Sequence, residues 1–294
     1  MISWLAMVVA GLVLVGEVRA QDAKDARLAE ARKMVDGLQP QAGEIKLGDD
    51  LATLRLPDDL RYLNPKDAAT VLTGLWGNPP TEGRTLGMIV PKDADFLSGS
   101  AWAVIITYDK DGHVKDDDAA KINYDAMLGD MQKAVKEGNA ERVKEGYAPI
   151  ELVGWAAPPK YDSIGKKLYW AKELKFGDEP EKTLNYNIRI LGREGVLVLN
   201  AVAASEDLSK IEAVTPELLS AVSFDPGKRY EDFNASTDKL ATYGLAALIA
   251  GGVAAKVGLF KGLWIALLAL KKFIVVGIIA IIAAVKRFFR GKAA

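Results

Sequence analysis

The last 55 residues of this 294-residue chain contain no acidic side chain. Residues 240–294 hold eight basic residues in an otherwise almost wholly apolar sequence, whereas residues 21–239 hold 29 basic and 38 acidic residues. The formal net charge of −1 therefore hides a charge of −9 in the central part and +8 in the C-terminal part. An apolar tail with spaced lysines and no acids is typical of a membrane-associated segment.

This tail predicts a membrane anchor over residues 240–289. The hydrocarbon core of a bilayer takes about 20 apolar residues, and a lysine at the centre of a span costs roughly 2.5–3.5 kcal/mol. We therefore expect a first transmembrane helix at about 240–260, with Lys256 near its cytoplasmic end, where the ammonium group reaches the interface. Residues from about 265 to 285 can form a second span, or residues 264–289 can lie along the inner face as a basic interfacial helix.

The first 20 residues predict a signal peptide. Residues 4–16 are an uninterrupted apolar run, and Val18 and Ala20 have the small-residue spacing that signal peptidase accepts. We expect cleavage before Gln21 and a helical leader over residues 21–40, with an uncleaved N-terminal anchor as the alternative. The two ends together predict a bacterial inner-membrane protein whose soluble domain faces the periplasm.

Composition excludes several classes of function. The acidic central part has no basic stripe for a phosphate backbone, so we expect no nucleic-acid partner. The chain has no cysteine and one histidine, His113. It can therefore form no disulfide, no thiolate nucleophile, no histidine-based triad and no multi-histidine metal centre within one chain. We expect no cofactor and no metal.

Residues 41–235 predict an extracytoplasmic α+β domain with a mostly antiparallel sheet and packing helices. Apolar and alternating segments between turn sequences predict strands at 43–47, 52–56, 86–90, 102–108, 151–157, 167–174, 184–191 and 195–203. Helices are expected at 65–75, at 116–145 with an apolar stripe, and in two short pieces at 207–213 and 216–222. The last four strands should form an antiparallel meander.

A dense group of aromatic residues is the candidate binding surface, comprising Trp155, Tyr161, Tyr169 and Trp170. Aromatic side chains beside two prolines can form a groove for an extended peptide or a glycan. Packing in the core is the alternative interpretation.

The acidic residues give no recognisable catalytic or calcium motif. Counting twelve positions from Asp109, an EF-hand would need Gly and Glu where the chain has Val114 and Ala120, so the acids there predict a turn and a helix cap instead. Asp162, Glu173 and Glu194 could meet in space as a carboxylate site, although any acidic domain offers such a triple. We assign no catalytic residue.

Several strings resemble a bacterial family of uncharacterised membrane-anchored proteins, DUF2167. They include GWAAPPKYD at 154–162, LYWAKEL at 168–174, ILGREGVL at 190–197 and the tail sequence at 243–256. The resemblance implies a membrane-anchored extracytoplasmic protein and carries over no catalytic residue, because the family has no assigned activity. The order of elements also resembles the PsbP-type α/β/α sandwich, which is a fold-level analogy.

These observations favour a non-catalytic binding or assembly module, with the lipid bilayer and an envelope protein as partners. One alternative is an envelope enzyme that uses carboxylates. Another is an accessory subunit of a membrane transporter, in which the lysine-spaced tail is the working part.

Overall fold

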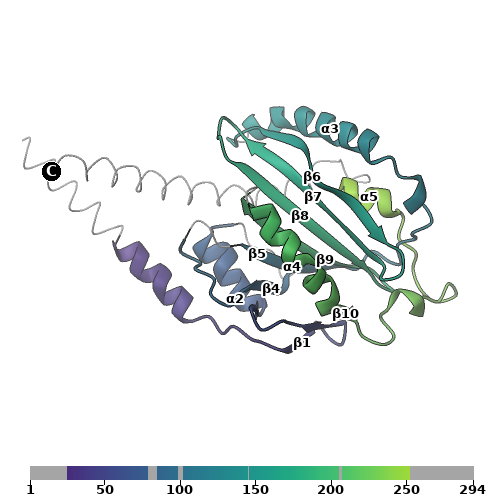
Figure 1. Ribbon diagram of the computed structural model, residues 1–294, viewed down its shortest axis with the longest axis horizontal. Helices are drawn as coiled ribbons and strands as arrows, with labels where there is room; N and C mark the ends of the chain where they lie inside the picture. Colours follow the sequence, from purple (N-terminus) through teal and green to yellow (C-terminus); the bar gives the residue numbers. More distant parts are fainter. Residues whose placement is uncertain (1–24, 79–84, 99–101, 145, 205–206, 252–294) are drawn as a thin grey trace, which may run out of the picture. The chain divides into compact units, whose positions relative to one another are not determined.

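The computed structural model describes residues 25–78, 85–98, 102–144, 146–204 and 207–251 (Figure 1). The chain divides into two compact units, residues 1–38 and 39–294. In the first unit, residues 25–36 form a helix within the expected leader. The signal peptide and the anchor residues from 252 onward lie outside the described residues. Among the residues that are described, no helix is both long and apolar enough to cross a membrane.

The second unit is built on a seven-stranded antiparallel sheet. Its strand order is β3-β4-β5-β9-β8-β7-β6. The strands are β3 (Leu60–Leu63), β4 (Thr85–Pro91), β5 (Ala103–Asp109), β6 (Ile150–Asp162), β7 (Lys167–Phe176), β8 (Lys182–Leu191) and β9 (Val196–Ala204). The last four strands pair in chain order. The predicted meander is therefore confirmed, and with it the α+β class with antiparallel strands.

A smaller sheet has the order β1-β2-β10, with strands at Glu44–Leu47, Ala52–Arg55 and Val222–Phe224. The predicted hairpin of β1 and β2 turns through Gly48 and Asp50, which have φ of 62° and 51°. Glycine and aspartate are among the residues that tolerate this left-handed conformation. The apolar side chains of this small sheet join those of the large sheet in one core, which also includes the buried face of α4 (Leu208–Ala221).

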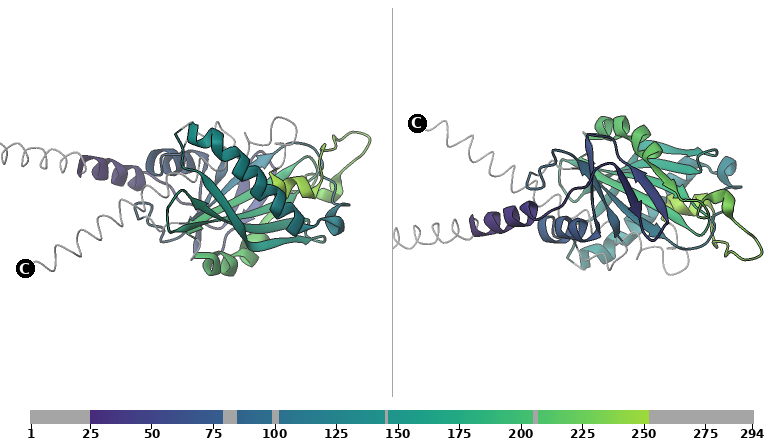
Figure 2. Two further views of the ribbon diagram at one scale, coloured as in Figure 1. Left: turned by 90° about the horizontal axis from the view of Figure 1, so that it is seen from above. Right: turned by 90° about the horizontal axis from the view of Figure 1, so that it is seen from below.

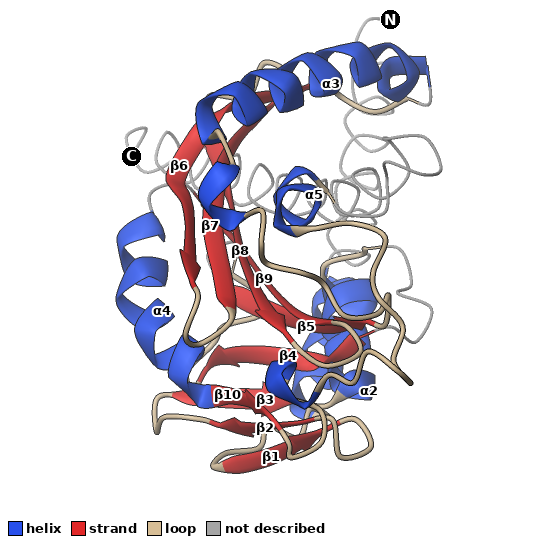
Figure 3. Cartoon of the chain, turned by 90° about the vertical axis from the view of Figure 1, so that its right-hand side faces the viewer, coloured by secondary structure: helices blue, strands red, loops and turns tan. Residues whose placement is uncertain are grey.

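The large sheet buries both of its faces. Leu184, Tyr186 and Ile188 in β8 point to the core shared with α4, so the residues between them point to the other face because side chains alternate along a strand. That other face carries α3 (Tyr124–Lys144) and α5 (Leu245–Ala250), as Figure 3 and the left view in Figure 2 show.

Helix α3 packs along β6 through the predicted apolar stripe. Met131 and Val135 are buried against Leu152 and Leu174. The sequence predicted that this helix begins at the Asp116–Asp118 run. In the structure it begins at Tyr124. Asp116 and Asp118 bind other segments, and Asp117 is exposed.

Two other helices differ from the prediction. α4 is one helix and continues through Pro216, because Ile211, Thr215 and Leu218 form a single buried face on the core. The predicted helix at 65–75 consists of α2 (Pro65–Ala69) and a π-helical turn (Thr70–Leu75). Asn64 caps α2, since its side chain accepts from the backbone N–H groups of Lys66 and Asp67.

The C-terminal end of the domain lies further along the chain than predicted. Residues 240–260 were expected to form a membrane span, yet Leu245, Leu248 and Ile249 of α5 are buried at 0–5% exposure on the α3 face of the sheet. Helix α5 ends at Gly251, whose φ is 122°. The described part of the domain therefore reaches Gly251, beyond the predicted boundary at 235.

Candidate functional site

The four aromatic residues of the predicted binding surface do not form one surface. Trp170 is 1% exposed and belongs to the apolar cluster under α5, which Trp155 and Tyr161 also contact. Tyr169 packs against the core on the opposite face of the sheet. Trp155 donates its indole N–H to the carbonyl oxygen of Tyr124 at 3.3 Å. These contacts match the alternative of core packing.

The three candidate carboxylates do not converge either. Asp162 accepts from the backbone N–H groups of Ile164 and Gly165 in the β6–β7 turn. Glu173 pairs with Lys182 at 2.9 Å, and Glu194 pairs with Lys228 at 3.4 Å. Because Asp162 pairs with Lys167 at the start of β7, Glu173 lies six residues along that strand, or about 20 Å away at 3.3 Å per residue. Glu173 therefore cannot join Asp162 at one reacting bond.

The aspartates after β5 bind protein donors. Asp111 accepts from the Tyr243 hydroxyl at 2.6 Å. Asp118 accepts from the backbone N–H groups of Leu245 and Ala246 at the N-terminus of α5. Within the residues that the structure describes, no group of three or more His, Cys, Asp or Glu side chains is arranged to hold a metal ion.

Asp116 is the acceptor of the densest group of side-chain hydrogen bonds in this region. It accepts from the Tyr161 hydroxyl at 2.6 Å, from Lys166 Nζ at 2.7 Å and from the Tyr230 hydroxyl at 3.0 Å. Burial alone would raise the pKa of Asp116, but these three donors outweigh it and lower the pKa. The donors come from β6, from the β6–β7 turn and from residue 230, so Asp116 ties three distant parts of the chain together.

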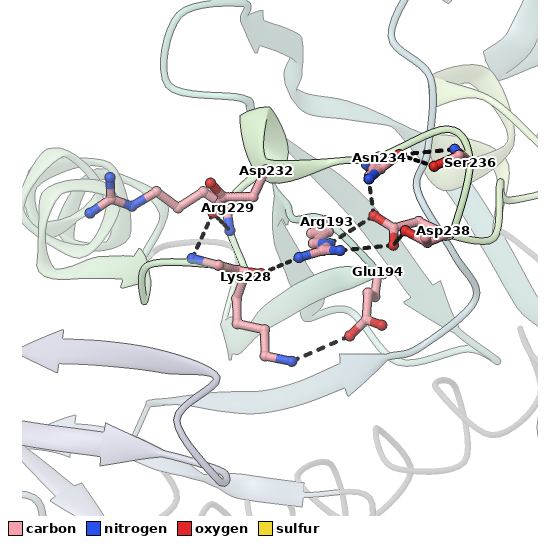
Figure 4. A network of polar contacts seen from close by, with 10 residues as sticks. Arg193, Glu194, Lys228, Arg229, Asp232, Asn234, Ser236 and Asp238 are labelled. Atoms are coloured by element: carbon pink, nitrogen blue, oxygen red, sulfur yellow. Dashed lines mark hydrogen bonds and ion pairs between the residues drawn. The ribbon is translucent and has the colours of Figure 1, made fainter.

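A second network attaches the segment of residues 225–243, here the C-terminal segment, to the β8–β9 turn (Figure 4). Arg193 donates to both carboxylate oxygens of Asp238 at 2.7 and 2.9 Å, and also to the Gly227 carbonyl oxygen. This bidentate pair lowers the pKa of Asp238. Asp232 accepts from the backbone N–H groups of Gly227 and Arg229. The C-terminal segment is thus fixed to the sheet before the chain reaches α5.

One group of polar side chains on the α3 face is not accounted for by such pairing. It lies on the middle strands β7, β8 and β9 and comprises Lys172, Asn185, Asn187, Arg189 and Asn200, which we call the polar row. Lys172 is directly opposite Asn185, and Asn187 is opposite Asn200. Because all five residues alternate with side chains of the α4 core, they share one face of the sheet.

The amides of the polar row bond mainly to one another. Asn187 Nδ2 donates to Asn185 Oδ1 at 2.8 Å, and Asn185 Nδ2 donates to Asn200 Oδ1 at 3.2 Å. Arg189 donates to Asn187 Oδ1 at 3.3 Å and to the Ile188 carbonyl oxygen at 3.1 Å. Its guanidinium carbon lies 5.2 Å from the centre of the Trp170 ring, a cation–π distance.

The two cations of the polar row have no acidic partner. Lys172 is 9% exposed, and burial followed by the charge of Arg189 lowers its pKa to about 8. Burial lowers the pKa of Arg189 to about 10, and Asp109 and Tyr243 offset only part of that change. No ion pair joins Lys172 or Arg189 to a carboxylate of the described residues. Trp170 Nε1 is also buried, and among the described residues it has no acceptor.

The polar row was not predicted from the sequence, although the alternation of residues in β8 indicates a polar face. In β8, polar residues alternate with apolar ones from Thr183 to Arg189, a pattern that usually predicts a solvated face. That face is buried here, which only the placement of α3 and α5 reveals.

The fold and these contacts define an α+β domain with a two-faced antiparallel sheet and a buried basic row. The family model "Protein of unknown function (DUF2167)" matches residues 39–282. The chain belongs to this family, as the strings in the sequence indicate. A search of the curated proteins finds no match.

Three solved structures show a low similarity. PsbP from the cyanobacterium Synechocystis has 11% identity and a TM-score of 0.33, and the match covers 64% of this chain and 92% of that one. The Ran-binding protein Mog1p from Saccharomyces cerevisiae has 11% identity and a TM-score of 0.32, covering 64% and 96%. LpqN of Mycobacterium tuberculosis, involved in cell envelope biogenesis, has 15% identity and a TM-score of 0.32, covering 67% and 96%. Similarities this low carry no functional argument.

Proposed function

We propose that this chain is a membrane-anchored extracytoplasmic protein whose domain binds a partner or ligand without catalysing a reaction. Membrane attachment is supported by the acid-free tail from residue 252 onward, together with the apolar run at 4–16. The bilayer of the bacterial inner membrane and an envelope protein are the proposed partners.

The observation that carries binding over catalysis is the state of the acidic side chains. An acid–base mechanism on carboxylates needs two of them at one reacting bond. Asp162, Glu173 and Glu194 instead each bond to separate donors, and Glu173 lies at the opposite end of β7 from Asp162. The buried donors of the polar row are better suited to holding a ligand.

Membrane fractionation with chemical cross-linking tests this proposal. We expect the mature chain to begin at Gln21, to sediment with membranes and to retain an envelope protein after solubilisation. An N-terminal sequence that starts at Met1 contradicts the cleaved signal peptide, and a soluble chain contradicts the anchor.

Amide variants separate binding from catalysis. Glu173→Gln and Glu194→Gln remove one charge each at exposed or half-buried ion pairs, so we expect neither to change partner retention or the cellular phenotype by more than a small amount. If either variant abolishes the phenotype while the chain stays folded and retains its partner, the enzyme alternative is correct.

A further inference from the structure

The polar row lies between two apolar clusters on the α3 face of the sheet. Along β7, Leu168 and Trp170 belong to the cluster under α5, whereas Leu174 and Phe176 belong to the cluster under α3. Lys172 is the residue between them on the same face. A buried strand position with apolar neighbours at both ends would ordinarily hold an apolar side chain, because an ammonium group loses its hydration there.

The polar row also has more donors than acceptors. Lysine offers three N–H donors and arginine five, and neither side chain accepts. Arg189 donates to Ile188 O and Asn187 Oδ1, while no hydrogen bond joins Lys172 Nζ to any of the described residues. Trp170 Nε1 lies on the same strand face and is 1% exposed, and it too has no acceptor in the part of the chain that the structure describes. Unpaired buried donors are costly and rare in native proteins.

We propose that the polar row is a binding site for an oxyanion group, a phosphate or a carboxylate, held by Lys172, Arg189 and the Trp170 indole N–H. This inference rests on the proposed binding function and names the chemistry of the ligand. An oxyanion supplies the missing acceptors, since the guanidinium fork matches two oxygens and the ammonium binds a third. A neutral or cationic ligand would leave two positive charges unpaired.

The surrounding charges agree with an anionic ligand. Among the described residues, Asp109 at the end of β5 is the carboxylate whose charge raises the pKa of Arg189, and no carboxylate raises the pKa of Lys172. The hydrogen bonds from the Asn187 amide to Asn185 and from the Asn185 amide to Asn200 fix the orientation of these side chains, and Asn187 in turn accepts from Arg189, so the guanidinium is partly oriented before a ligand binds.

The test uses the full chain in a neutral detergent at constant ionic strength. Inorganic phosphate represents a free phosphate, acetate a carboxylate, and dihexanoyl phosphatidylglycerol a lipid headgroup, with chloride as the reference anion. We expect at least one probe to raise the melting temperature saturably, because a ligand of the folded state stabilises it by mass action. A response to the lipid alone identifies a headgroup as the source, and no saturable response to any probe overturns the proposal.

Two variants locate the response. Lys172→Met should weaken binding of the active probe by about 30-fold or more, since one member of a buried charge contact is removed. Without anion it should melt no lower than the wild type, because methionine has no charge to desolvate. Lys160→Met is the matched control. It removes the same charge from an exposed position on the neighbouring strand β6 and should bind like the wild type.

A second substitution keeps the test decisive if Lys172→Met does not fold. Asn200→Asp retains the oxygen that accepts from Asn185 and adds a fixed negative charge to the row, so the response to the probe should be lost. Unchanged probe binding by Lys172→Met or Asn200→Asp overturns the oxyanion site. If the oxyanion site is overturned in this way but both variants stay membrane-bound and keep their cross-linked partner, the proposed function still holds.

Discussion

His113 is a titratable residue that the fold uses for packing. Its ring stacks on Phe233 with centroids 4.0 Å apart and lies 4.2 Å from the Tyr230 ring. Burial lowers the pKa of His113, and hydrogen bonds to backbone groups of Arg193 and Gly192 only partly oppose this. The ring of His113 therefore packs with two aromatic side chains.

The lowered pKa of His113 predicts a loss of stability in mild acid. The unfolded chain takes up a proton below about pH 6.5, while the folded chain resists it, so the free energy of unfolding falls as the pH drops through that value. His113→Phe keeps a stacked ring but cannot be protonated. We therefore expect the stability of the wild type relative to this variant to decline between pH 8 and pH 5, as measured by urea unfolding at each pH. A constant difference would contradict a buried neutral histidine.

Helix α5 shows how a short element depends on a residue far away in the chain. Its six residues are too few to form a stable helix alone. Asp118, which precedes α5 by more than 120 residues, accepts from its first two N–H groups. A Cβ atom on Gly244 would lie 2.6 Å from Asp118 Oδ2, so glycine is needed for this approach.

Removing this cap should loosen α5 specifically. We expect Asp118→Ala to lower the free energy of unfolding by about 1 kcal/mol, as for other lost N-caps, and to raise hydrogen exchange at Leu245 and Ala246. Asp117→Ala is the control, since Asp117 is exposed and adjacent. Equal exchange in both variants would show that Asp118 does not hold the helix.

Elements with strong local signals were predicted well. The β6–β9 meander follows from alternation between turn sequences, and α3 follows from the spacing of Met131 and Val135. Strands β3 and β10 were not predicted, and they are defined in the structure by their pairing with β4 and β2. The end of the domain was placed too early because hydrophobicity does not distinguish a protein core from a lipid core, and α5 is as apolar as the tail.

The candidate site was less predictable than the fold. The aromatic residues around Trp170 indicated β7, which also carries Lys172 of the polar row. Strand alternation, however, places Tyr169 and Trp170 on opposite faces of the sheet. The polar row joins residues from three strands up to 28 positions apart, and its burial depends on helices elsewhere in the sequence. Strand pairing and the burial of a side chain depend on residues far apart in the sequence, so a local sequence pattern does not predict them.

At the scale of the molecule, the described residues after 238, which end at Gly251, pack against the domain. Leu240 forms a parallel β-bridge with His113, in which the N–H of Ala241 donates to the His113 carbonyl oxygen at 2.8 Å. Tyr243 then reaches Asp111, and α5 buries Leu245, Leu248 and Ile249. These contacts continue through Ile249, within the residues from 240 onward that were predicted to form the anchor.

The soluble protein of residues 21–251 should consequently be far more stable than that of residues 21–238. Burying each of three aliphatic side chains contributes about 1.5–3 kcal/mol, so the shorter protein loses roughly 5 kcal/mol or more, comparable to the whole stability of many domains. Urea unfolding followed by circular dichroism should show a cooperative transition for residues 21–251. For residues 21–238 it should show a much earlier or broadened one. Equal midpoints and slopes for the two proteins would mean that α5 contributes little to the fold and that the boundary near residue 235 is adequate after all.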